Sequence, residues 1–516
     1  MIDSMYVYNL GQKFKFSVRN NSNKVAIVFN EKNSITFLEL EILSNRVANF
    51  LIGQGVKKGD VVAIQNNKTA TGFAAMIACL KLGIIYTNFD YTNPKERISR
   101  IFEVANPKLV LADTRNEEIF DLCQIISIPY IDMGNVEVYD NILKQEDSIN
   151  EDLLKQVSDG TPVYIMFTSG STGIPKGVLI RQRSLLNFIE WGKETYQLNE
   201  TDIMTNINPI YFDNSVFDFF ISIFNGISMV AISKDTLDDP VKMVRIIDEN
   251  QCTVWFSVPS VLIYLNNLKL LNKSVLKSIR IFVFGGEGYP KELLRKLYNI
   301  YAETAELYNV YGPTEGTCIC SSYKITPNDI EQDGLAPLGN IASNFDYYIL
   351  DDKNKEAYYG ELCLMGTQLA IGYYNDIERT NKSFVKCPIR NDYFELMYRT
   401  GDIVEKIDGK LYFKGRIDNQ IKHMGYRIEL EEIENALIKV KEIKQCAVVH
   451  TISKNKFSRL VAYIAADQVL EISYLRIQLK KYLPYYMIPS DFKFMSELPK
   501  NVNGKIDRVL LEQNML

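Results

Sequence analysis

Short apolar runs with the length of β-strands alternate with helix-like segments through about the first 300 residues. Residues 61–64 precede a helix-like segment at 70–82, and residues 84–86 follow as the next strand. Further runs of this kind occur at 253–256 and 279–284. Strands that are apolar at every position, with helices between them, are typical of parallel sheets covered on both faces. The alternation therefore predicts an α/β fold for this part of the chain.

The rest of the chain has a different pattern. From about residue 336, strands separated by turns replace the alternation, as at 347–350 and 361–364, which indicates a β-rich part of antiparallel character. After residue 416, a helix at 430–440 and a strand at 446–449 indicate a small α+β domain of about 100 residues. A chain of 516 residues also exceeds what one hydrophobic core supports, so we expect about three to five structural units.

The composition argues against several classes of function. Lys and Arg total 58 against 63 Asp and Glu, a net charge of -5, so a nucleic-acid partner is not expected. His423 and His450 are the only histidines, which argues against a Ser-His-Asp or Cys-His nucleophile and against a His-rich metal site. We expect His423 at the surface and His450 in a structural role. The chemistry then depends on lysines, carboxylates, hydroxyls and backbone amides.

Cysteines and apolar segments predict a cytoplasmic protein without a membrane partner. Eight cysteines occur with no C-x-x-C spacing, so buried thiols are expected rather than disulfides or a zinc site. The first residues lack the basic and apolar regions of a signal peptide. The most apolar stretch, at 219–232, has 14 residues, whereas a helix that spans a bilayer needs about 20.

One loop has the composition of a phosphate-binding site. An apolar strand at 164–167 leads into TSGSTGIPKG at 168–177, which contains three glycines, four hydroxyls and one lysine. Glycines let backbone amides approach an anion, hydroxyls add donors, and Lys176 supplies positive charge. A P-loop would open a helix at its lysine, whereas residues 177–180 continue as a strand. We expect a hairpin whose loop closes over phosphates; the alternative is an ordinary Gly/Ser turn.

This loop resembles the signature loop of the adenylate-forming enzymes, which include acyl-CoA synthetases, luciferases and the adenylation domains of nonribosomal peptide synthetases. Further segments are similar to motifs of the same superfamily and occur in the same order: LYNVYGPTE at 307–315, GELCL at 360–364 with Gly372-Tyr373, YRTGD at 398–402, GRID at 415–418 and NGKIDR at 503–508. Residues 212–220, 254–260 and 415–434 resemble D-alanine–carrier-protein ligases and freestanding adenylation domains in particular.

The resemblance implies a fold and a reaction. The α/β fold would have a large N-terminal domain at 1–417, with two α/β subdomains at roughly 1–335 and a β-barrel-like subdomain at roughly 336–417. A small, mobile α+β lid would follow at 418–516, with Asp418 as its hinge. The reaction implied joins a carboxylate and Mg-ATP to give an acyl adenylate and pyrophosphate, after which the acyl group passes to a thiol.

The resemblance also assigns roles in nucleotide binding and catalysis. Lys505 would bridge the substrate carboxylate and the α-phosphate, Thr314 would lie beside the α-phosphate, and Glu315 would bind Mg²⁺. Tyr311 would stack on adenine, and Asp402 would bind the ribose hydroxyls. The other nucleotide-binding residues that it implies are Thr168, Ser169, Gly170, Ser171, Thr172, Gly173 and Lys176 of the loop, together with Gly286, Glu287, Asn309, Gly312 and Arg416.

One acidic residue indicates an amino acid substrate. By resemblance, Asp213 in FDNSVFD at 212–218 would pair with a substrate α-ammonium, because a charge beside an apolar run needs a partner. The alternative is that Asp213 caps the helix through residues 219–220. The other pocket residues implied are Asn214, Phe217, Ser257, Val283, Gly285, Val310, Cys318 and Ile319. These residues carry no further charge, so a neutral amino acid of small to medium size is expected. Gly285 departs from the D-alanine ligases, where a cysteine aligns.

The resemblance also implies an acceptor for the acyl group, and two other functions are considered. The chain ends eight residues after Arg508, so the acceptor implied is the phosphopantetheine thiol of a separate carrier protein, or coenzyme A. An acyl- or aryl-CoA synthetase that activates a plain carboxylic acid is the rival enzyme, and Asp213 would then be a cap. A catalytically silent nucleotide-binding or scaffold protein is disfavoured by the presence of Glu315, Asp402 and Lys505.

Overall fold

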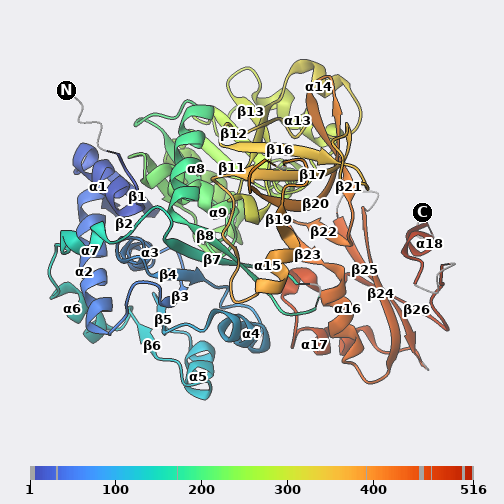
Figure 1. Cartoon of the computed structure of the whole chain (residues 1–516), viewed down its shortest axis with the longest axis horizontal. Helices are drawn as coiled ribbons and strands as arrows, with labels where there is room; N and C mark the ends of the chain where they lie inside the picture. The colour runs from blue at the N-terminus through green and yellow to red at the C-terminus, as the bar shows by residue number, and fades with distance from the viewer. Residues whose placement is uncertain are drawn as a thin grey trace. The chain divides into compact units, whose positions relative to one another are not determined.

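The computed structural model describes residues 6–30, 33–170, 172–390, 392–452, 458–466, 468–501 and 506–513 (Figure 1). The chain forms two compact units. The first unit comprises Met1–Phe89, Ala105–Met166 and Gly177–Ile417, and the second comprises Asp90–Val104, Phe167–Lys176 and Asp418–Leu516. Two short segments from the N-terminal half, one of them the signature loop, are therefore packed with the C-terminal segment.

A nine-stranded sheet in the first unit has the order β15-β14-β13-β12-β11-β9-β10-β1-β2. Its strands are β1 Val25–Asn30, β2 Asn33–Thr36, β9 Ile203–Asn206, β10 Ser228–Ala231, β11 Val254–Ser257, β12 Ile281–Gly285, β13 Glu306–Tyr311, β14 Ser321–Lys324 and β15 Asn340–Ile341. The run from β13 to β1 is parallel, and β2, β14 and β15 are antiparallel to their neighbours. Every residue of β11 and β12 is buried, which confirms the expectation of parallel strands covered on both faces.

A seven-stranded sheet has the order β18-β8-β7-β4-β3-β5-β6. Its strands are β3 Val61–Gln65, β4 Ile85–Asn88, β5 Leu109–Ala112, β6 Tyr130–Asp132, β7 Pro162–Thr168, β8 Lys176–Arg181 and β18 Gly372–Tyr373. The strands from β7 to β6 are parallel, and β18 is antiparallel to β8. Because β7 and β8 are neighbours, the signature loop connects two adjacent strands, as expected for a hairpin.

Helices pack around these two sheets (Figure 1). They are α1 Leu10–Asn21, α2 Phe37–Gly53, α3 Ala70–Leu82, α5 Glu117–Ile125, α6 Val136–Leu143, α7 Glu151–Lys155, α8 Gln182–Thr195, α9 Asn214–Val216, the π-helix η1 Phe217–Ile221, α10 Lys234–Leu237, α11 Pro240–Glu249, α12 Pro259–Asn267, α13 Lys291–Tyr301, the 3-10 helix η2 Thr314–Gly316, α14 Pro327–Glu331 and α15 Ile377–Ser383. Helix α3 is buried at every position from Gly72 onward, and its Phe73 stacks on Phe219 of η1 with ring centroids 5.4 Å apart.

The β-rich part is a five-stranded antiparallel sheet in the order β16-β17-β20-β19, with β21 also paired to β20. Its strands are β16 Phe345–Leu350, β17 Tyr359–Gly366, β19 Phe384–Lys386, β20 Leu396–Ile407 and β21 Lys410–Arg416. This sheet begins at Phe345, since β15 still pairs with β14 in the nine-stranded sheet.

The C-terminal segment of the second unit is an α+β structure with its own core. It contains a hairpin, a three-stranded sheet and short helices: β22 Gln420–His423, β23 Tyr426–Glu429, α16 Leu430–Ile438, β24 Ile443–Ile452, β25 Ser458–Ala466, α17 Ile472–Leu479, η3 Tyr485–Met487, β26 Asp491–Met495 and α18 Arg508–Gln513. Helix α4, Lys95–Ala105, belongs to the same unit except for its last residue. The apolar side of α16, including Ile433 and Leu437, packs against β24 and β25 in this core.

His423 is buried, so the expectation of a surface position is wrong. Its Nδ1 lies 2.5 Å from the hydroxyl of Ser458, and Nε2 of His450 lies 2.5 Å from the same oxygen. One hydroxyl can donate to one ring and accept from the other, which satisfies both neutral imidazoles inside the unit. The shared hydroxyl thus explains how a buried His423 and a half-buried His450 can lie side by side.

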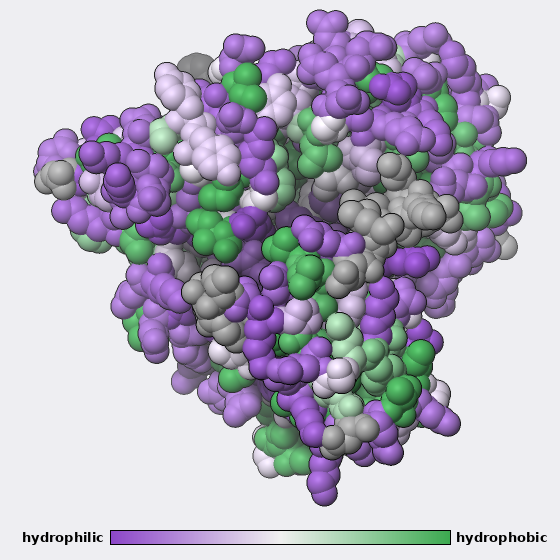
Figure 2. Space-filling view, turned by 90° about the vertical axis from the view of Figure 1, so that its right-hand side faces the viewer, coloured by the Kyte–Doolittle hydropathy of each residue, from purple (hydrophilic) through white to green (hydrophobic). Residues whose placement is uncertain are grey.

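Hydrophilic side chains cover most of the face shown in Figure 2, and the thiols are buried. No helix within the described residues is long and apolar enough to cross a membrane. On the face shown in Figure 2, hydrophilic side chains predominate and hydrophobic ones form small separate groups. All eight cysteines are buried and free, as their spacing predicted.

Candidate active site

The predicted substrate residues gather at the carboxyl ends of neighbouring parallel strands. Ser257 ends β11, Gly285 ends β12, and Val310 lies one residue before the end of β13. Gly285 is the direct partner of Val310 in the sheet register. Ligands of α/β proteins bind beyond this edge of a parallel sheet, so the strand order itself creates the place for a substrate.

The side chain of Asp213 contacts Thr314, which lies just after the end of β13. The Thr314 hydroxyl donates a hydrogen bond of 2.5 Å to Oδ2 of Asp213. Asp213 precedes α9, but its carboxylate forms no helix-capping hydrogen bond within the described part of the chain. The capping alternative is therefore not supported. Two residues predicted for different roles, one at the α-ammonium and one at the α-phosphate, are brought into direct contact.

The other pocket residues are tightly packed. Phe217, Ser257 and Val283 have no surface accessible to a water-sized probe, and Val310, Cys318 and Ile319 have 5%, 4% and 2%. The Phe217 ring packs on Phe256 with centroids 4.7 Å apart. Indole Nε1 of Trp255 donates to the Ser257 hydroxyl at 2.8 Å, and that hydroxyl donates to the Val258 carbonyl oxygen at 3.1 Å. Asn214 is half-buried in α9.

Glycine is required at the end of β12. A Cβ built on Gly285 would lie 2.3 Å from the carbonyl oxygen of Val310 and 2.5 Å from its Cγ2. The backbone oxygen cannot move without breaking the sheet, so a side chain at this position is excluded. This close approach explains the departure from the D-alanine ligases in terms of this chain's own packing.

Glu315 is completely buried in η2, beside the Thr314–Asp213 pair. The hydroxyl of Tyr373 in β18 donates to its Oε1 at 2.6 Å. A buried carboxylate held in one orientation suits Mg²⁺, which commonly binds through one or two carboxylates together with phosphates and water. No group of three His, Cys, Asp or Glu side chains that could hold a metal by themselves occurs among the described residues. The chemistry of the Glu315 carboxylate fits one ligand of such an ion.

Tyr311, Asp402 and Arg416 form a second cluster in the first unit. The Tyr311 hydroxyl donates to Oδ2 of Asp402 at 2.6 Å, and Arg416 forms an ion pair with Oδ1 of the same carboxylate. Asp402 and Arg416 are register partners in β20 and β21. Burial raises the pKa of Tyr311 well above its usual value, and the Asp402 carboxylate raises it further, so the tyrosine keeps its proton. The cluster presents a charge-compensated carboxylate beside an aromatic ring.

The other residues of the first unit that are predicted to bind the nucleotide have structural contacts as well. Oε1 of Glu287 accepts a hydrogen bond of 2.7 Å from the backbone N–H of Ser260 in the first turn of α12. The Asn309 amide donates to the Pro337 carbonyl oxygen at 2.8 Å. Gly286 has a φ of 91°, a conformation that favours glycine, and a Cβ on Gly312 would lie 2.3 Å from the Cys318 carbonyl oxygen. These contacts shape the ends of β12 and β13.

The signature loop lies in the second unit. The Ser169 hydroxyl donates to the Arg427 carbonyl oxygen at 2.7 Å, and Lys176 forms an ion pair of 2.9 Å with Glu429. The Thr168 hydroxyl is buried with no hydrogen-bond partner in the described part of the chain, as expected of a donor kept for a ligand. A Cβ on Gly170 would lie 2.1 Å from the Ile174 carbonyl oxygen, so the tight turn needs glycine. Thr172 is exposed and Gly173 is buried.

Two predicted residues, Ser171 and Lys505, lie outside the described residues. Asp418, the predicted hinge, is the first residue of the C-terminal segment of the second unit. The sequence prediction missed Tyr373 and Glu429 as the partners of Glu315 and Lys176. Both occur inside segments that resembled family motifs, at 372–373 and 415–434, but only the fold pairs them.

Two buried opposite charges, Lys68 and Asp218, were also missed, although Asp218 stands inside the apolar run of η1. Asp218 is completely buried and accepts hydrogen bonds from the side-chain amides of Asn206 and Asn208 at 3.2 and 3.0 Å. Lys68 donates to the Asn206 carbonyl oxygen at 2.6 Å. Burial lowers the pKa of Lys68 and raises the pKa of Asp218, and each charge opposes the shift of the other. Asn206 connects the two, because it accepts from Lys68 and donates to Asp218.

Comparisons with known proteins agree with this architecture. The family model "AMP-binding enzyme" matches residues 14–374, and the model "AMP-binding enzyme C-terminal domain" matches residues 432–505. Gramicidin S synthase 2 of Brevibacillus brevis is 32% identical over 97% of this chain, which spans 11% of that relative's length. Zwittermicin A synthase ZmaJ of Bacillus cereus is 30% identical, with 96% of this chain and 93% of the relative covered.

A solved structure shows the same fold. The Vibrio cholerae adenylation domain AlmE, in complex with glycyl-adenosine-5′-phosphate, has a TM-score of 0.84 and 23% identity, and the match covers 100% of this chain and 99% of that one. The predicted fold class, a large N-terminal α/β domain and a smaller C-terminal domain, is confirmed. The chain therefore belongs to the AMP-binding enzyme family, ligases that use ATP.

Proposed function

We propose that this chain activates a small to medium neutral amino acid with ATP as an aminoacyl adenylate, and then transfers it to the phosphopantetheine thiol of a separate carrier protein in the cytoplasm. The contact between Thr314 and Asp213 carries the proposal. The Asp213 carboxylate is half-buried beyond the carboxyl ends of the parallel strands and is not used as a helix cap, so it is suited to attract a positively charged group of a substrate. A substrate α-ammonium would be that group, beside the residues proposed to bind ATP.

The residues of the first unit fit the two substrates of this reaction. In the adenylation step a carboxylate oxygen of the amino acid attacks the α-phosphorus, the bond to the β-phosphate oxygen breaks, and pyrophosphate leaves. Asp402 would accept the ribose hydroxyls while Arg416 balances its charge. Glu315 would hold Mg²⁺, which supplies positive charge against the phosphate oxygens. The substrate carboxylate and the α-phosphate are both anions and must approach each other. Cations and hydrogen-bond donors directed at their oxygens therefore lower the barrier more than a general base would.

Residues of the second unit are proposed to act on the phosphates and on the substrate carboxylate. The Thr168 hydroxyl and the backbone amides of the signature loop would donate to the β- and γ-phosphates, with Lys176 as their countercharge. Lys505 would place its ammonium against the substrate carboxylate and the α-phosphate. We further propose that residues 418–516 move about Asp418 between the two half-reactions, which suits the change from a small acid to a carrier-bound thiol.

The packing of the pocket favours the small end of the proposed substrate range. Phe217, Ser257 and Val283 are inaccessible to a water-sized probe, so they line no open space. Val310 packs directly against the backbone of Gly285. Close packing in this region favours a substrate with few side-chain atoms.

The rival function is that of an acyl- or aryl-CoA synthetase. Such an enzyme needs ATP and the same phosphate-binding residues, but it does not need a carboxylate opposite an ammonium. The distinction therefore depends on Asp213 alone.

ATP–pyrophosphate exchange tests the proposal directly. Amino acids of both configurations and their des-amino analogues are supplied one at a time, and exchange above background identifies the activated acid. Exchange with a small neutral amino acid is expected, and exchange only with plain carboxylic acids would replace the proposal by its rival. Thioester formation on a phosphopantetheinylated carrier protein, compared with coenzyme A, then identifies the acceptor.

A further inference from the structure

The turn that follows β13, residues 314–319, has an unfavourable backbone conformation. Thr317 has a φ of 58° and Cys318 has a φ of 71°, so two successive residues other than glycine are left-handed. A β-branched threonine rarely adopts this region, and such a turn persists only where its surroundings hold it. The same turn carries four residues predicted for the site: Thr314, Glu315, Cys318 and Ile319.

Gln368, in the connection between β17 and β18, holds the turn on both sides of the strained residues. Its amide Nε2 donates hydrogen bonds to the carbonyl oxygens of Gly316 at 3.2 Å and Ile319 at 2.9 Å. The Thr317 hydroxyl donates to the Gln368 carbonyl oxygen at 2.6 Å. One residue distant in the chain therefore fixes the backbone before and after the left-handed pair.

The chemistry of the Gln368 side chain indicates that its donors matter. The residue is completely buried, and its Oε1 has no hydrogen-bond partner in the described part of the chain. An unpaired buried acceptor costs free energy, so an apolar side chain of similar size would serve better if packing were the only role. Exchanging the oxygen and nitrogen of the amide would set Oε1 against both carbonyl oxygens, so the two donated bonds also fix its orientation.

Neighbours of Gln368 in the same connection hold Glu315. The backbone N–H of Ala370 donates to the Glu315 carbonyl oxygen at 2.8 Å, and the Tyr373 hydroxyl donates to its carboxylate. The connection itself is anchored, because the Ser184 hydroxyl of α8 donates to the Leu369 carbonyl oxygen at 3.0 Å. The turn is therefore held by a segment that is fixed in its own place.

The turn lies against Asp213 at two of its residues. The Thr314 hydroxyl donates to the Asp213 carboxylate. Burial raises the pKa of the Cys318 thiol well above its usual value, and the Asp213 carboxylate raises it further, which indicates that the two side chains are near each other. A shift of the turn would therefore change the surroundings of the carboxylate proposed to bind the substrate.

We propose that Gln368 is a positioning residue for the adenylation reaction, because its two donated hydrogen bonds hold the turn 314–319 in the shape that sets Thr314 against Asp213. This inference rests on the proposed function and extends it by one residue. Gln368 acts through the turn and does not need to touch the substrate. Without its donors the left-handed pair can relax, and the groups that the turn carries lose their alignment with Asp213.

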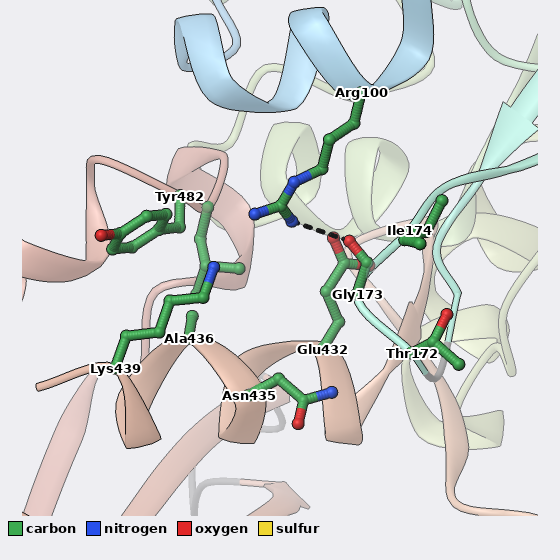
Figure 3. Close-up of a pocket in the computed structure, with 10 residues that line it drawn as sticks. Arg100, Thr172, Gly173, Ile174, Glu432, Asn435, Ala436, Lys439 and Tyr482 are labelled. Atoms are coloured by element: carbon green, nitrogen blue, oxygen red, sulfur yellow. Dashed lines mark hydrogen bonds between the residues drawn. The ribbon is translucent and has the colours of Figure 1, made fainter. Parts of the chain in front are cut away.

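The signature loop is held by different contacts, within the second unit. Arg100 of α4 donates a hydrogen bond of 2.8 Å to the Gly173 carbonyl oxygen, beside the pocket shown in Figure 3. The ion pair of Lys176 and the hydrogen bond of the Ser169 hydroxyl also lie in that unit. These three contacts involve no residue of the connection that holds the turn. Replacing Gln368 should therefore leave the loop residues with their partners.

Three variants of the full chain separate the donors of Gln368 from its packing. Gln368→Met removes the amide at similar size, and Gln368→Glu keeps the shape. The matched control is Gln65→Met, at the last residue of β3 in the seven-stranded sheet. Gln65 is also buried, its amide donates to the Thr114 carbonyl oxygen at 2.7 Å, and its Oε1 likewise has no partner among the described residues. The control thus removes the same chemistry from another part of the first unit.

ATP–pyrophosphate exchange is measured with whichever acid the unmodified protein activates. Gln368→Met should lower kcat/KM for that acid about tenfold or more, because the groups on the turn are misplaced, whereas Gln65→Met should change it less than about twofold. Adenosine, which carries only the base and the ribose, should inhibit Gln368→Met and the unmodified protein with constants within about twofold of each other. Urea unfolding shows what share of each variant is folded in the assay.

The conservative variant tests the hydrogen bonds themselves. Burial raises the pKa of a carboxyl group, so at pH 6 the new side chain in Gln368→Glu is protonated and can donate to one of the two carbonyl oxygens. Its kcat/KM should then exceed that of Gln368→Met about threefold or more.

The proposal would be overturned by an unchanged kcat/KM in Gln368→Met, by an equal loss in Gln65→Met, by an equal loss of adenosine inhibition, or by no advantage of Gln368→Glu at pH 6. Exchange only with plain carboxylic acids would instead replace the proposed function. The ratios between variants would still test Gln368 with such an acid, so the two failures are distinguishable.

Discussion

Replacing Asp213 by asparagine is the sharpest test of the proposed substrate. The substitution keeps the shape of the side chain and an oxygen that can still accept from the Thr314 hydroxyl, which lies 2.5 Å away. It removes only the negative charge. The variant should therefore fold normally and lose its preference for acids that carry an α-ammonium.

The size of the loss follows from the surroundings of Asp213. Truncating one partner of a buried charge pair costs about 2–5 kcal/mol, and the half-buried position of Asp213 places it at the lower end. About 2 kcal/mol corresponds to a loss of about 30-fold in kcat/KM for the amino acid. The des-amino analogue has no ammonium to lose, so its kcat/KM should change by less than about threefold.

ATP–pyrophosphate exchange is measured with the amino acid and with its des-amino analogue. For each acid, the kcat/KM of the variant is divided by that of the unmodified protein, which gives two ratios. Asp235→Asn serves as a matched control, because it removes an exposed carboxylate from α10 at a distance in sequence from the pocket segments. Both ratios should be unaffected in the control. Equal losses for the amino acid and its des-amino analogue would refute the ammonium role of Asp213.

Three further predictions concern the nucleotide, the reaction and the pH. Tyr311→Phe removes the donor to Asp402 and should raise the KM for ATP about tenfold in the exchange assay, with a normal unfolding curve. Lys505→Ala should lower adenylate formation about 10²–10³-fold while calorimetric ATP binding survives; undiminished exchange would remove the role of Lys505. Burial, together with His450, lowers the pKa of His423 to about 4, so below pH 6.5 the unfolded chain binds a proton that the folded chain does not. Stability should therefore fall by up to about 3 kcal/mol as the pH drops from 6.5 towards 4, and urea unfolding of His423→Gln should show a flatter dependence.

The strand framework was accessible from the sequence because it depends on local patterns. The apolar runs at 253–256 and 279–284 became the adjacent strands β11 and β12, and the pocket residues at their ends came together as a consequence. Parallel strands must begin and end at the same edges, so residues at strand ends can be grouped from the sequence alone.

The side-chain partners could not be predicted from the sequence, because each contact joins residues that are far apart in the chain. Thr314 and Asp213 are 101 residues apart, and Glu429 and Lys176 are 253 apart. No periodicity relates such positions. His423 was misplaced for the same reason: a buried imidazole is tolerated only with a partner, and Ser458 becomes visible as that partner once β22 and β25 are placed.

Labelling of the eight buried thiols can report local unfolding of the chain. Cys79, Cys123, Cys252, Cys318, Cys320, Cys363 and Cys387 belong to the first unit, and Cys446 of β24 belongs to the second. A thiol reagent cannot reach these buried sulfurs in the folded chain. Each labelled cysteine therefore indicates that the region around it has unfolded transiently. Mass spectrometry after timed labelling in mild denaturant counts the events on each molecule. A species that carries a single label on Cys446 would show that the second unit unfolds while the first remains intact.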